Sequence, residues 1–367
     1  MEDKIKVTKG SAIIYRVFDV GNEITLPAAA KLFETSTQDN FGLVSDTRKA
    51  IIIKNAPLRL NLGEQSIELG SKTYSIAVGA KIWHYGVISV AMTLSIEPGT
   101  SWRELISLAA IIEESRAVEE CAAAWRDRLV QKMLPAIAQP SSWQTIEDYV
   151  TWVIEKYDGV STPAELMLHA DVPALILAEH LLPLSDSSRG IVTENALQYS
   201  ANDLAVIDWN SALLIEPAGS HEVADVIEFC LTHLLEMRYY DSVIEGKLNT
   251  LYDSLETKKV DALSNFYARL ARDAGRQYME FSEFLGRIEN SIKTVGDFYL
   301  ATVFRMANRE FRFNDWRDSV DRKMETLARI SQVLNSEVNT RRSVLLEIIV
   351  ILLIAIELVP FFNLLFR

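Results

Sequence analysis

Apolar runs separated by turn residues dominate the first 98 residues of the chain. Four of these runs are rich in β-branched and aromatic residues and are bounded by Gly, Asn or Pro: SAIIYRVFDV, KAIIIKNAPLRLNL, SKTYSIAVGAKIW and GVISVAMTLSI. This composition is typical of strands. The segment TLPAAAKLF, which follows the first run, predicts a short helix.

A helical spacing begins after this strand-rich part. Leu105, Leu108 and Ile112 recur at helical intervals. Ser101 is followed three residues later by Glu104, which predicts a capping box at the start of the helix.

Residues 140–190 carry three breaks, QPSSWQ, DGVSTP and LPLSDSSRG, and two short helices are expected between them. The role of this region stays open. Extended structure returns at ENALQYSANDLAVIDWNSALLIEP, where Leu204, Val206 and Trp209 fit a mostly buried strand pair. We therefore expect residues 1–219 to form one α+β domain, whose two strand-rich ends join a common sheet across the helical middle.

From about His221 onward, apolar residues recur at alternating intervals of three and four residues; each such series is called a seam below. The first seam consists of Val223, Ile227, Cys230, Leu234, Met237, Asp241, Ile244, Leu248, Leu251 and Leu255. A second seam consists of Leu285, Ile288, Ile292, Val295 and Tyr299, and resumes at Phe313, Trp316, Val320, Leu327, Ile330 and Leu334. Such heptad spacing predicts a long helical hairpin or coiled coil over residues 220–342. Its first helix would be about 50 Å long.

The last apolar run extends from Val344 to Phe366 and is long enough to cross a bilayer. A carboxylate at the bilayer centre costs roughly 2.5–3.5 kcal/mol, whereas each Leu, Ile, Val or Phe contributes about 0.3–0.6 kcal/mol in favour of insertion. Glu347 can reach the interface, and only Glu357 is deep. We expect residues 343–367 to form a C-terminal transmembrane anchor; a buried helix of a soluble bundle is the alternative.

Charges near this run favour a membrane-facing end. Arg341 and Arg342 flank its near side, and residues 300–342 hold nine Lys or Arg against six Asp or Glu. Excess positive charge marks the cytoplasmic side and attracts anionic lipid. The lipid bilayer is therefore an expected partner, with the large N-terminal part on the cytoplasmic side. We also expect the anchors to self-associate through Glu357, because intramembrane carboxylates usually face protein or water.

The net charge, the number of cysteines and the first residues argue against several classes of function. The formal net charge of −13 argues against direct nucleic-acid binding, which needs clustered Lys and Arg. Two cysteines cannot form a disulfide framework and fit a reducing compartment. The first residues form neither a secretory signal nor a transit peptide.

No motif in the sequence announces catalysis, and no cofactor is expected. Walker and dinucleotide-binding loops and the Gly-x-Ser-x-Gly elbow are absent. Cys230 and His233 share a helix face, but a zinc site needs three or four ligands, so no metal site is expected. The aromatic strand patch at Trp83 and Tyr85 could stack a base; without a basic groove beside it, a place in the sheet core is favoured.

Arg238 and Asp241 stand three residues apart on the predicted helix, which permits an ion pair. Asp241 interrupts the seam, where an unpaired charge would be costly. Two interpretations stay open. In one, Asp241 is paired across the hairpin and fixes the helix register; in the other, the seam rotates and Asp241 is solvated.

Several segments give the chain a family resemblance. KIWHYGVISV, AVIDWNSALLIEP, LLEMRYYDSVIEGKLNTLYDSL and DFYLATVFRMANREFRFNDWRDSVDRKMETLARI, with the final Leu-Glu-plus-apolar run, resemble the domain of unknown function 155 family, also called the required-for-meiotic-nuclear-division family. The likeness covers most of the chain from Lys81 onward. The motif residues, for which structural roles are expected, are Trp83, Tyr85, Gly86, Asp208, Trp209, Arg238 and Asp241.

This resemblance implies a membrane-anchored protein with an α+β domain, long helices and one terminal span, and it implies no enzymatic activity. Mitochondrial members of that family sit at the inner membrane and are implicated in translation of membrane-inserted products. Without a transit peptide, a bacterial inner membrane is the preferred location. We expect a homo-oligomeric, non-enzymatic scaffold with a protein partner. The alternative is a membrane-tethered enzyme or nucleotide-binding regulator with a site in residues 1–219.

Overall fold

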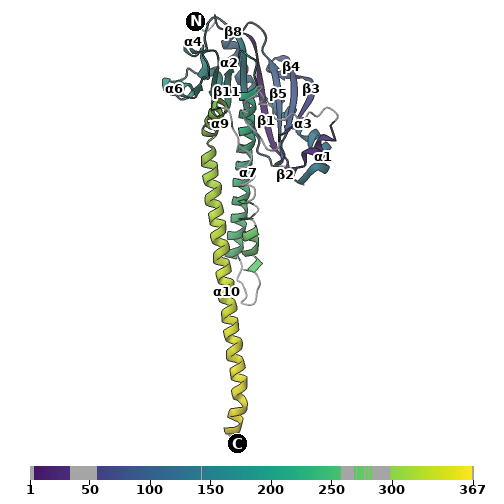
Figure 1. Ribbon diagram of the computed structural model, residues 1–367, viewed down its shortest axis with the longest axis vertical. Helices are drawn as coiled ribbons and strands as arrows, with labels where there is room; N and C mark the ends of the chain where they lie inside the picture. Colours follow the sequence, from purple (N-terminus) through teal and green to yellow (C-terminus); the bar gives the residue numbers. More distant parts are fainter. Residues whose placement is uncertain are drawn as a thin grey trace. The chain divides into compact units, whose positions relative to one another are not determined.

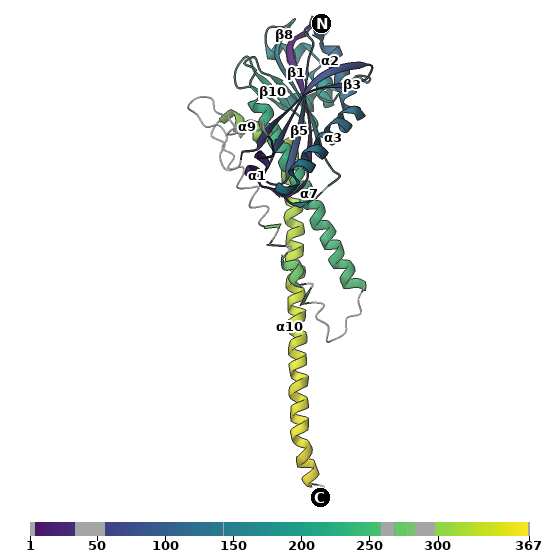
Figure 2. The same ribbon diagram turned by 90° about the vertical axis from the view of Figure 1, so that its right-hand side faces the viewer.

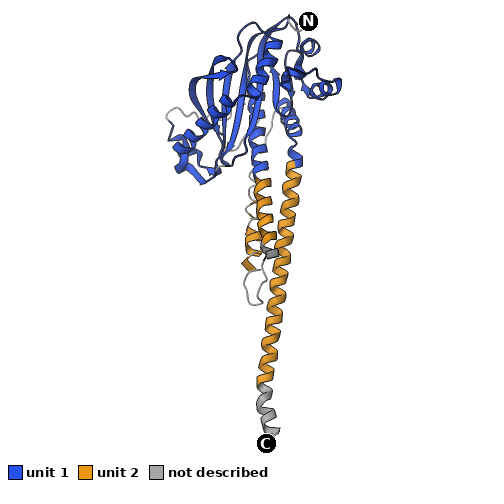
Figure 3. Cartoon of the chain, turned by 180° about the vertical axis from the view of Figure 1, so that it is seen from behind, with its two compact units in different colours: residues 1–239, 289–315 blue, residues 240–288, 316–367 orange. Residues whose placement is uncertain are grey.

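A computed structural model describes most of the chain: residues 4–33, 56–141, 143–257, 268–269, 271–276, 278–279, 281–282 and 298–365. Within these ranges, the side chains of residues 254–257 and 357–365 lie outside the description. Two compact units are present (Figure 3). Unit 1 comprises Met1–Tyr239 and Glu289–Asp315, and unit 2 comprises Tyr240–Ile288 and Trp316–Arg367.

Unit 1 is built on a large mixed sheet (Figure 1). The strands of this sheet are β1 (Lys6–Asp19), β3 (Leu58–Leu69), β4 (Lys72–Ile82), β5 (Val87–Ser95), β6 (Thr100–Ser101), β8 (Glu147–Asp158), β9 (Ala196–Leu197), β10 (Leu204–Ile207) and β11 (Ser211–Ile215). In the described part of the chain their order is β3-β4-β5-β1-β8-β11-β10-β9, and β6 pairs with β1. Only the β8–β11 pair in this sheet is parallel. A small second sheet pairs β2 (Gly21–Ile24) with β7 (Ile137–Pro140).

Helices cover both faces of the sheet in unit 1. They are α1 (Leu26–Ala30), α2 (Trp102–Glu113), α3 (Arg116–Met133), the 3-10 helix η2 (Leu134–Ala136), α4 (Pro163–His169), α5 (Val172–Ile176), α6 (Asp186–Glu194), α9 (Phe298–Glu310) and the first part of α7 (Glu222–Thr257). On one face, Arg16 of β1 is bonded to Glu119 of α3. On the other face, Lys81 of β4 is bonded to Glu228 of α7. Figures 1 and 2 show the first part of α7 lying along the sheet.

The predicted capping box is confirmed at the start of α2. The Ser101 hydroxyl accepts a hydrogen bond from the Glu104 backbone N–H at 3.3 Å, and the Ser101 N–H donates to the Glu104 carboxylate at 2.8 Å. The helical stretch that follows is divided in two, because Ser115 caps a new helix by accepting a hydrogen bond from the Val118 N–H. A polar residue that can cap a helix N-terminus favours such a break.

Residues 140–190 contain the two expected short helices, α4 and α5, and also a long strand that the sequence did not predict. Strand β8 lies between β1 and β11, and all its residues from Tyr149 to Ile154 are buried. A strand buried on both faces shows no alternation of polar and apolar residues, which is the usual signal for a strand. The expectation of a common sheet is confirmed, because β8 joins β1 to the pair β10–β11. The part of the run KAIIIKNAPLRLNL before Ala56 lies outside the described residues.

Helix α7 begins one residue after His221, as the seam predicts, and its first part belongs to unit 1. Every residue from Val226 to Met237 is buried, so this part of the helix is covered on all sides. The expected domain boundary at residue 219 therefore precedes a helix that is packed into the sheet domain.

Unit 2 contains the remainder of α7 and most of α10 (Phe313–Leu365), the other long helix. The described seam positions of this unit are mostly buried: Ile244, Leu248, Leu251, Val320, Leu327 and Leu334. Leu285, Ile288, Ile292 and Val295, from the second seam, lie outside the described residues. The fold is therefore mixed α/β, with a large sheet and long C-terminal helices.

The terminal apolar run belongs to α10 as far as Leu365. Among the residues that the structure describes, no helix is long and apolar enough to cross a membrane. The side chain of Glu357, on which the predicted self-association depends, lies outside that description.

Candidate functional site

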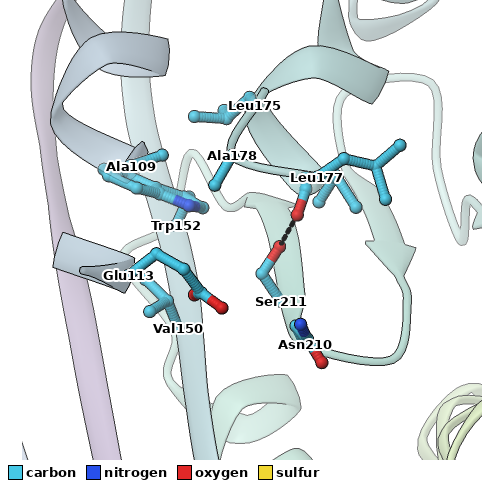
Figure 4. A pocket seen from close by; sticks show the side chains of 10 residues that line it. Ala109, Glu113, Val150, Trp152, Leu175, Leu177, Ala178, Asn210 and Ser211 are labelled. Carbon is cyan, nitrogen blue, oxygen red and sulfur yellow. Dashed lines mark hydrogen bonds between the residues drawn. The ribbon is translucent and has the colours of Figure 1, made fainter. Parts of the chain in front are cut away.

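A pocket opens on the face of the sheet that carries α2 and α5 (Figure 4). It is small, with about 30 Å³ of space open to a water-sized molecule. Its lining comes from α2, β8, the end of α5 and the turn into β11: Ala109, Glu113, Val150, Trp152, Leu175, Ile176, Leu177, Ala178, Asn210 and Ser211. Small-molecule sites usually have volumes of roughly 300–1,000 Å³ and mostly apolar linings, so this hollow is much smaller and more polar than such sites.

Three polar side chains line this pocket. The buried Ser211 hydroxyl donates its proton to the Ile176 carbonyl at 2.8 Å, so its lone pairs remain available. Glu113 and Asn210 are exposed residues. Figure 4 shows the Glu113 carboxylate directed toward the space in front of Ser211.

The carboxyl of Glu113 has a perturbed environment. Partial burial raises its pKa above the usual value, and the nearby Asp148 raises it further, whereas Arg16 opposes the shift. A perturbed carboxyl beside a pocket is a marker of functional sites, although ion networks produce the same effect.

The backbone beside the pocket is strained at Ala178, whose φ is +50°. The Glu179 N–H bonds to the Ala174 carbonyl and the Ala178 N–H to the Leu175 carbonyl, so α5 ends in a Schellman motif. Glycine is the usual residue at this left-handed position, because it has no Cβ to cause strain. Here the alanine side chain forms part of the pocket wall instead.

A buried group of four charges lies between the sheet and α7. Lys81 donates to Asp225 at 2.6 Å and to Glu228, and Arg59 donates to Asp225 at 2.6 Å. Burial lowers the pKa of Lys81, but Glu228 and Asp225 raise it by more. Burial likewise raises the pKa of Asp225, and Lys81 with Arg59 brings it below its usual range. Two cations balance two carboxylates, so we interpret this group as structural.

The aromatic motif residues lie in the core of unit 1. Trp83 is fully buried and its ring centroid is 5.5 Å from that of Phe229 in α7. The Tyr85 hydroxyl lies 2.7 Å from the Thr232 hydroxyl. Because both rings are covered by α7, neither is available for stacking on a base.

Gly86 ends the turn that contains these aromatic residues. Its φ is +91°, and an added Cβ would lie 1.6 Å from the Gly21 carbonyl oxygen. A glycine is therefore required by the close approach of two backbone segments.

Asp208 and Trp209 occupy the turn between β10 and β11. The Asp208 carbonyl accepts a hydrogen bond from the Tyr149 hydroxyl at 2.9 Å, which ties the turn to β8. The expectation that Trp209 is part of a buried strand is wrong: its side chain is 45% exposed, because the strand ends at Ile207 and Trp209 stands in the turn.

Arg238 and Asp241 each form an ion pair with a residue of another element. Arg238 donates to Glu147 of β8 at 2.5 Å, within unit 1. In unit 2, Asp241 accepts hydrogen bonds from the Ser319 hydroxyl at 2.7 Å and pairs with the Lys323 ammonium at 2.9 Å. Asp241 is thus paired with another helix, as the first of the two interpretations predicts.

The end of α10 presents apolar side chains to solvent in every direction. Arg341 is paired with Glu337 at 2.9 Å, and Arg342 and Glu347 are exposed. Eleven large apolar side chains follow, each between 41% and 61% exposed: Val344, Leu345, Leu346, Ile348, Ile349, Val350, Ile351, Leu352, Leu353, Ile354 and Ile356.

Metal chemistry finds no support in the described part of the chain, where no three His, Cys, Asp or Glu side chains are grouped to hold an ion. Cys230 and His233 are both buried in the core. Burial raises the pKa of the Cys230 thiol far above its usual range, and it lowers the pKa of His233 to about 4.

Taken together, these features define a mixed α/β sheet domain, with a small pocket beside α2 and β8, and long C-terminal helices. The chain belongs to the family described as "Uncharacterized protein MJ0711, N-terminal domain", whose model matches residues 9–222. A relative from Methanocaldococcus jannaschii, the protein MJ0711 itself, is 23% identical over 167 residues, which are 45% of this chain. The match covers 51% of that relative, so the chain spans about half the length of the curated protein that it matches. No solved structure matches the chain.

The pocket was not predicted from the sequence. One of its walls is β8, whose buried run lacks the alternation of polar and apolar residues, and its polar residues come from separate elements. One feature of the sequence hints at the unusual turn beside the pocket: Ala178 directly follows a helix, at a position where glycine is common.

Proposed function

We propose that the protein is a membrane-attached, non-enzymatic scaffold whose C-terminal segment enters a lipid bilayer. The observation that supports this proposal is the exposure of apolar side chains around the whole circumference of α10 from Val344 to Ile356. An amphipathic helix that packs on one partner keeps a polar face, whereas a helix that is apolar all round needs an apolar environment on every side.

The energies favour insertion. Eleven large apolar side chains at about 0.3–0.6 kcal/mol each contribute roughly 3–7 kcal/mol. A carboxylate at the bilayer centre costs roughly 2.5–3.5 kcal/mol on the insertion scale. Glu347 lies near the arginine pair, where it can reach the interface, so this cost falls on Glu357. In the sequence, the run continues beyond Glu357 to Phe366 and is interrupted there by Pro360 and Asn363.

The scaffold would assemble through its long helices and bind a protein partner through unit 1. The Asp241–Lys323 pair supports a fixed alignment of two helices in unit 2, which is what a coiled coil needs. The resemblance to the domain of unknown function 155 family suggests a role near translation or membrane-protein biogenesis. We further propose that the large N-terminal part faces the cytoplasm, with a bacterial inner membrane as the preferred location.

The test is membrane fractionation of the full-length protein beside a form that ends at Thr340, followed by carbonate extraction. We expect only the full-length form to resist extraction. Ile351→Lys places a charge in the apolar run and should weaken retention, whereas Val333→Lys, at an exposed apolar position earlier in α10, is the matched control. Equal extraction of the full-length and shortened forms would contradict membrane insertion.

A second candidate function is ligand binding by unit 1, as expected for a tethered enzyme or regulator. The pocket at Glu113 favours it, because polar groups and a carboxyl with a raised pKa line a small hollow there.

A further inference from the structure

The turn after α5 presents leucine side chains to solvent. Leu181 and Leu182 are 77% and 70% exposed, and Leu177, directly after α5, is 42% exposed. Single apolar side chains scattered over a surface are normal, whereas exposed apolar side chains that are grouped mark interaction sites. We name residues 177–182 the leucine turn.

Hydrogen bonds hold the backbone of the leucine turn in place. The Glu179 carboxylate accepts the N–H groups of Leu181 and Leu182 at 2.8 and 2.9 Å. Beyond the turn, Arg189 of α6 forms a bidentate pair with Asp171, the N-cap of α5, with both contacts at 2.7 Å. A surface that is already ordered loses little conformational entropy when it binds a partner, so leucines on this turn are suited to serve as anchors.

The surroundings of the leucine turn are acidic. Between residues 159 and 200 the sequence holds a single Lys or Arg, which is Arg189. The acids of the same segment are Glu165, Asp171, Glu179, Asp186 and Glu194. Glu113, which lines the same hollow as Leu177, adds a further carboxylate, and Asp148 acts on it with the same sign. A partner that buries the leucines therefore approaches a negative surface, which attracts cations and repels anions.

The same charges argue against two other occupants of this surface. A second copy of the chain that bound through the same surface would bring like charges together, which costs free energy. An anionic lipid surface attracts basic segments, and the acids around the leucine turn would oppose its approach. The acidic border thus favours a protein partner that carries positive charge beside its apolar side chains.

We propose that the leucine turn binds a cationic amphipathic helix of a partner protein. The apolar stripe of such a helix would cover Leu177, Leu181 and Leu182, and Lys or Arg residues beside the stripe would face the carboxylates. This inference specifies the partner that the proposed scaffold would bind through unit 1, and so it rests on that part of the proposed function. It does not depend on whether α10 enters a bilayer.

The experiment uses the full-length protein, labelled with 5-fluorotryptophan, in nanodiscs of phosphatidylcholine. The fluorine signal of Trp209, assigned with a Trp209→Phe variant, reports on this surface, because the adjacent Asn210 lines the same hollow as Leu177. The probe is a Leu–Lys peptide of about 18 residues, whose leucines are spaced to form one stripe of a helix. We expect this peptide to shift the Trp209 signal in a saturable way, with a dissociation constant on the order of 0.1 mM or lower.

Variants of the protein locate the binding. The double variant Leu181→Ser/Leu182→Ser should weaken peptide binding at least about tenfold, because two leucines no longer contribute apolar area to the complex. Leu134→Ser, at a leucine after α3 that is 51% exposed, is the matched control and should leave binding unchanged. All three leucines are exposed, so none of these changes should unfold the protein.

A second peptide tests the charge preference. It has the same leucine stripe with Glu in place of every Lys, and we expect it to bind at least about tenfold more weakly, because its charges are repelled by the acids around the leucine turn. Equal binding of the two peptides would overturn the preference for a cationic helix. Equal binding of the Lys peptide to the double variant and to the unchanged protein would show that the leucine turn is not the site.

Two further outcomes would overturn the inference. One is the absence of any saturable shift of the Trp209 signal with the Lys peptide. The other is a shift caused by vesicles of phosphatidylcholine and phosphatidylglycerol without one from the Lys peptide, which would indicate a lipid surface as the occupant. Entry of the protein into the nanodiscs is measured before the titration, and the titration is read in either case, so failure of membrane attachment and failure of peptide binding are distinguished.

Discussion

The buried group of charges beneath α7 makes a quantitative prediction about Lys81. The Lys81→Met change keeps most of the length of the side chain but removes the ammonium that contacts Asp225 at 2.6 Å and also contacts Glu228. Glu228 is only 2% exposed, so its carboxylate would remain buried without this cation. Removing one partner of a buried ion pair costs about 3–5 kcal/mol, a large part of the roughly 5–15 kcal/mol that stabilises a typical domain.

Urea unfolding of the full-length protein in mild detergent, followed by tryptophan fluorescence, measures this loss. Fluorescence reports mainly on unit 1, which holds every tryptophan of the chain except Trp316. Lys72→Met, at an exposed position in the same strand, is the matched control and should change the free energy of unfolding by less than about 0.5 kcal/mol. The double variant Lys81→Met/Glu228→Gln should recover part of the loss, because it removes the isolated charge. If Lys81→Met lowered the free energy of unfolding by less than about 1 kcal/mol, or if the double variant recovered none of the loss, the interpretation that Lys81 neutralises buried carboxylates would be refuted.

Three further predictions concern other parts of the chain. Burial raises the pKa of Asp19 to about 6, above its unfolded value near 4. The stability that Asp19 contributes at low pH, about 3 kcal/mol, should therefore be lost as pH rises from about 4 to 6. Asp19→Asn should flatten that part of the curve of unfolding free energy against pH, and an unchanged curve would contradict this. Gly86→Ala should prevent stable folding because of its backbone clash, while Gly63→Ala, with a similar φ and open space around it, should cost only about 1 kcal/mol in thermal unfolding; similar losses at both sites would show that the clash is relieved. A double-mutant cycle of Asp241→Asn and Lys323→Met should give a coupling energy of about 1 kcal/mol in the unfolding of unit 2, monitored by the fluorescence of Trp316, and a value near zero would mean that the pair is solvated.

The sequence predicts the elements of this fold well where one periodicity dominates. The capping box at Ser101 and the long helix beginning near His221 are both found where they are expected. These signals are local, because a cap depends on four residues and a seam on regular spacing. The common sheet was also predictable, since strand-rich segments must bury one another's faces.

Elements buried on every side were not predictable in the same way. Strand β8 has no alternation, because both of its faces are covered. The pocket requires β8 to place Trp152 beside Glu113 of a distant helix, so it became visible only with the tertiary structure.

Helix α7 shows why the spacing of apolar residues alone assigns some buried polar residues to the surface. Its apolar seam identifies one buried side, and the polar positions between seam residues would ordinarily face water. In unit 1 Glu228, Thr232 and Glu236 are nevertheless buried, because β4 supplies Lys81 and the turn after it supplies Tyr85 as partners for the first two. Burial of polar groups is tolerated where partners exist, and partners on other strands cannot be identified from the spacing within one helix.

The end of α10 presents the opposite case. Between Val344 and Ile356 every side chain except Glu347 is apolar, yet the described part of the protein leaves the large ones exposed. In α7 the protein itself supplies the partners that permit charged groups to be buried, whereas in α10 no comparable apolar surface within the described residues covers the helix. Because the exposed side chains surround the helix, the environment that completes this segment must also surround it. A bilayer would surround the helix in this way, whereas a single protein surface covers one side, so the proposed membrane attachment predicts that truncation at Thr340 abolishes membrane retention.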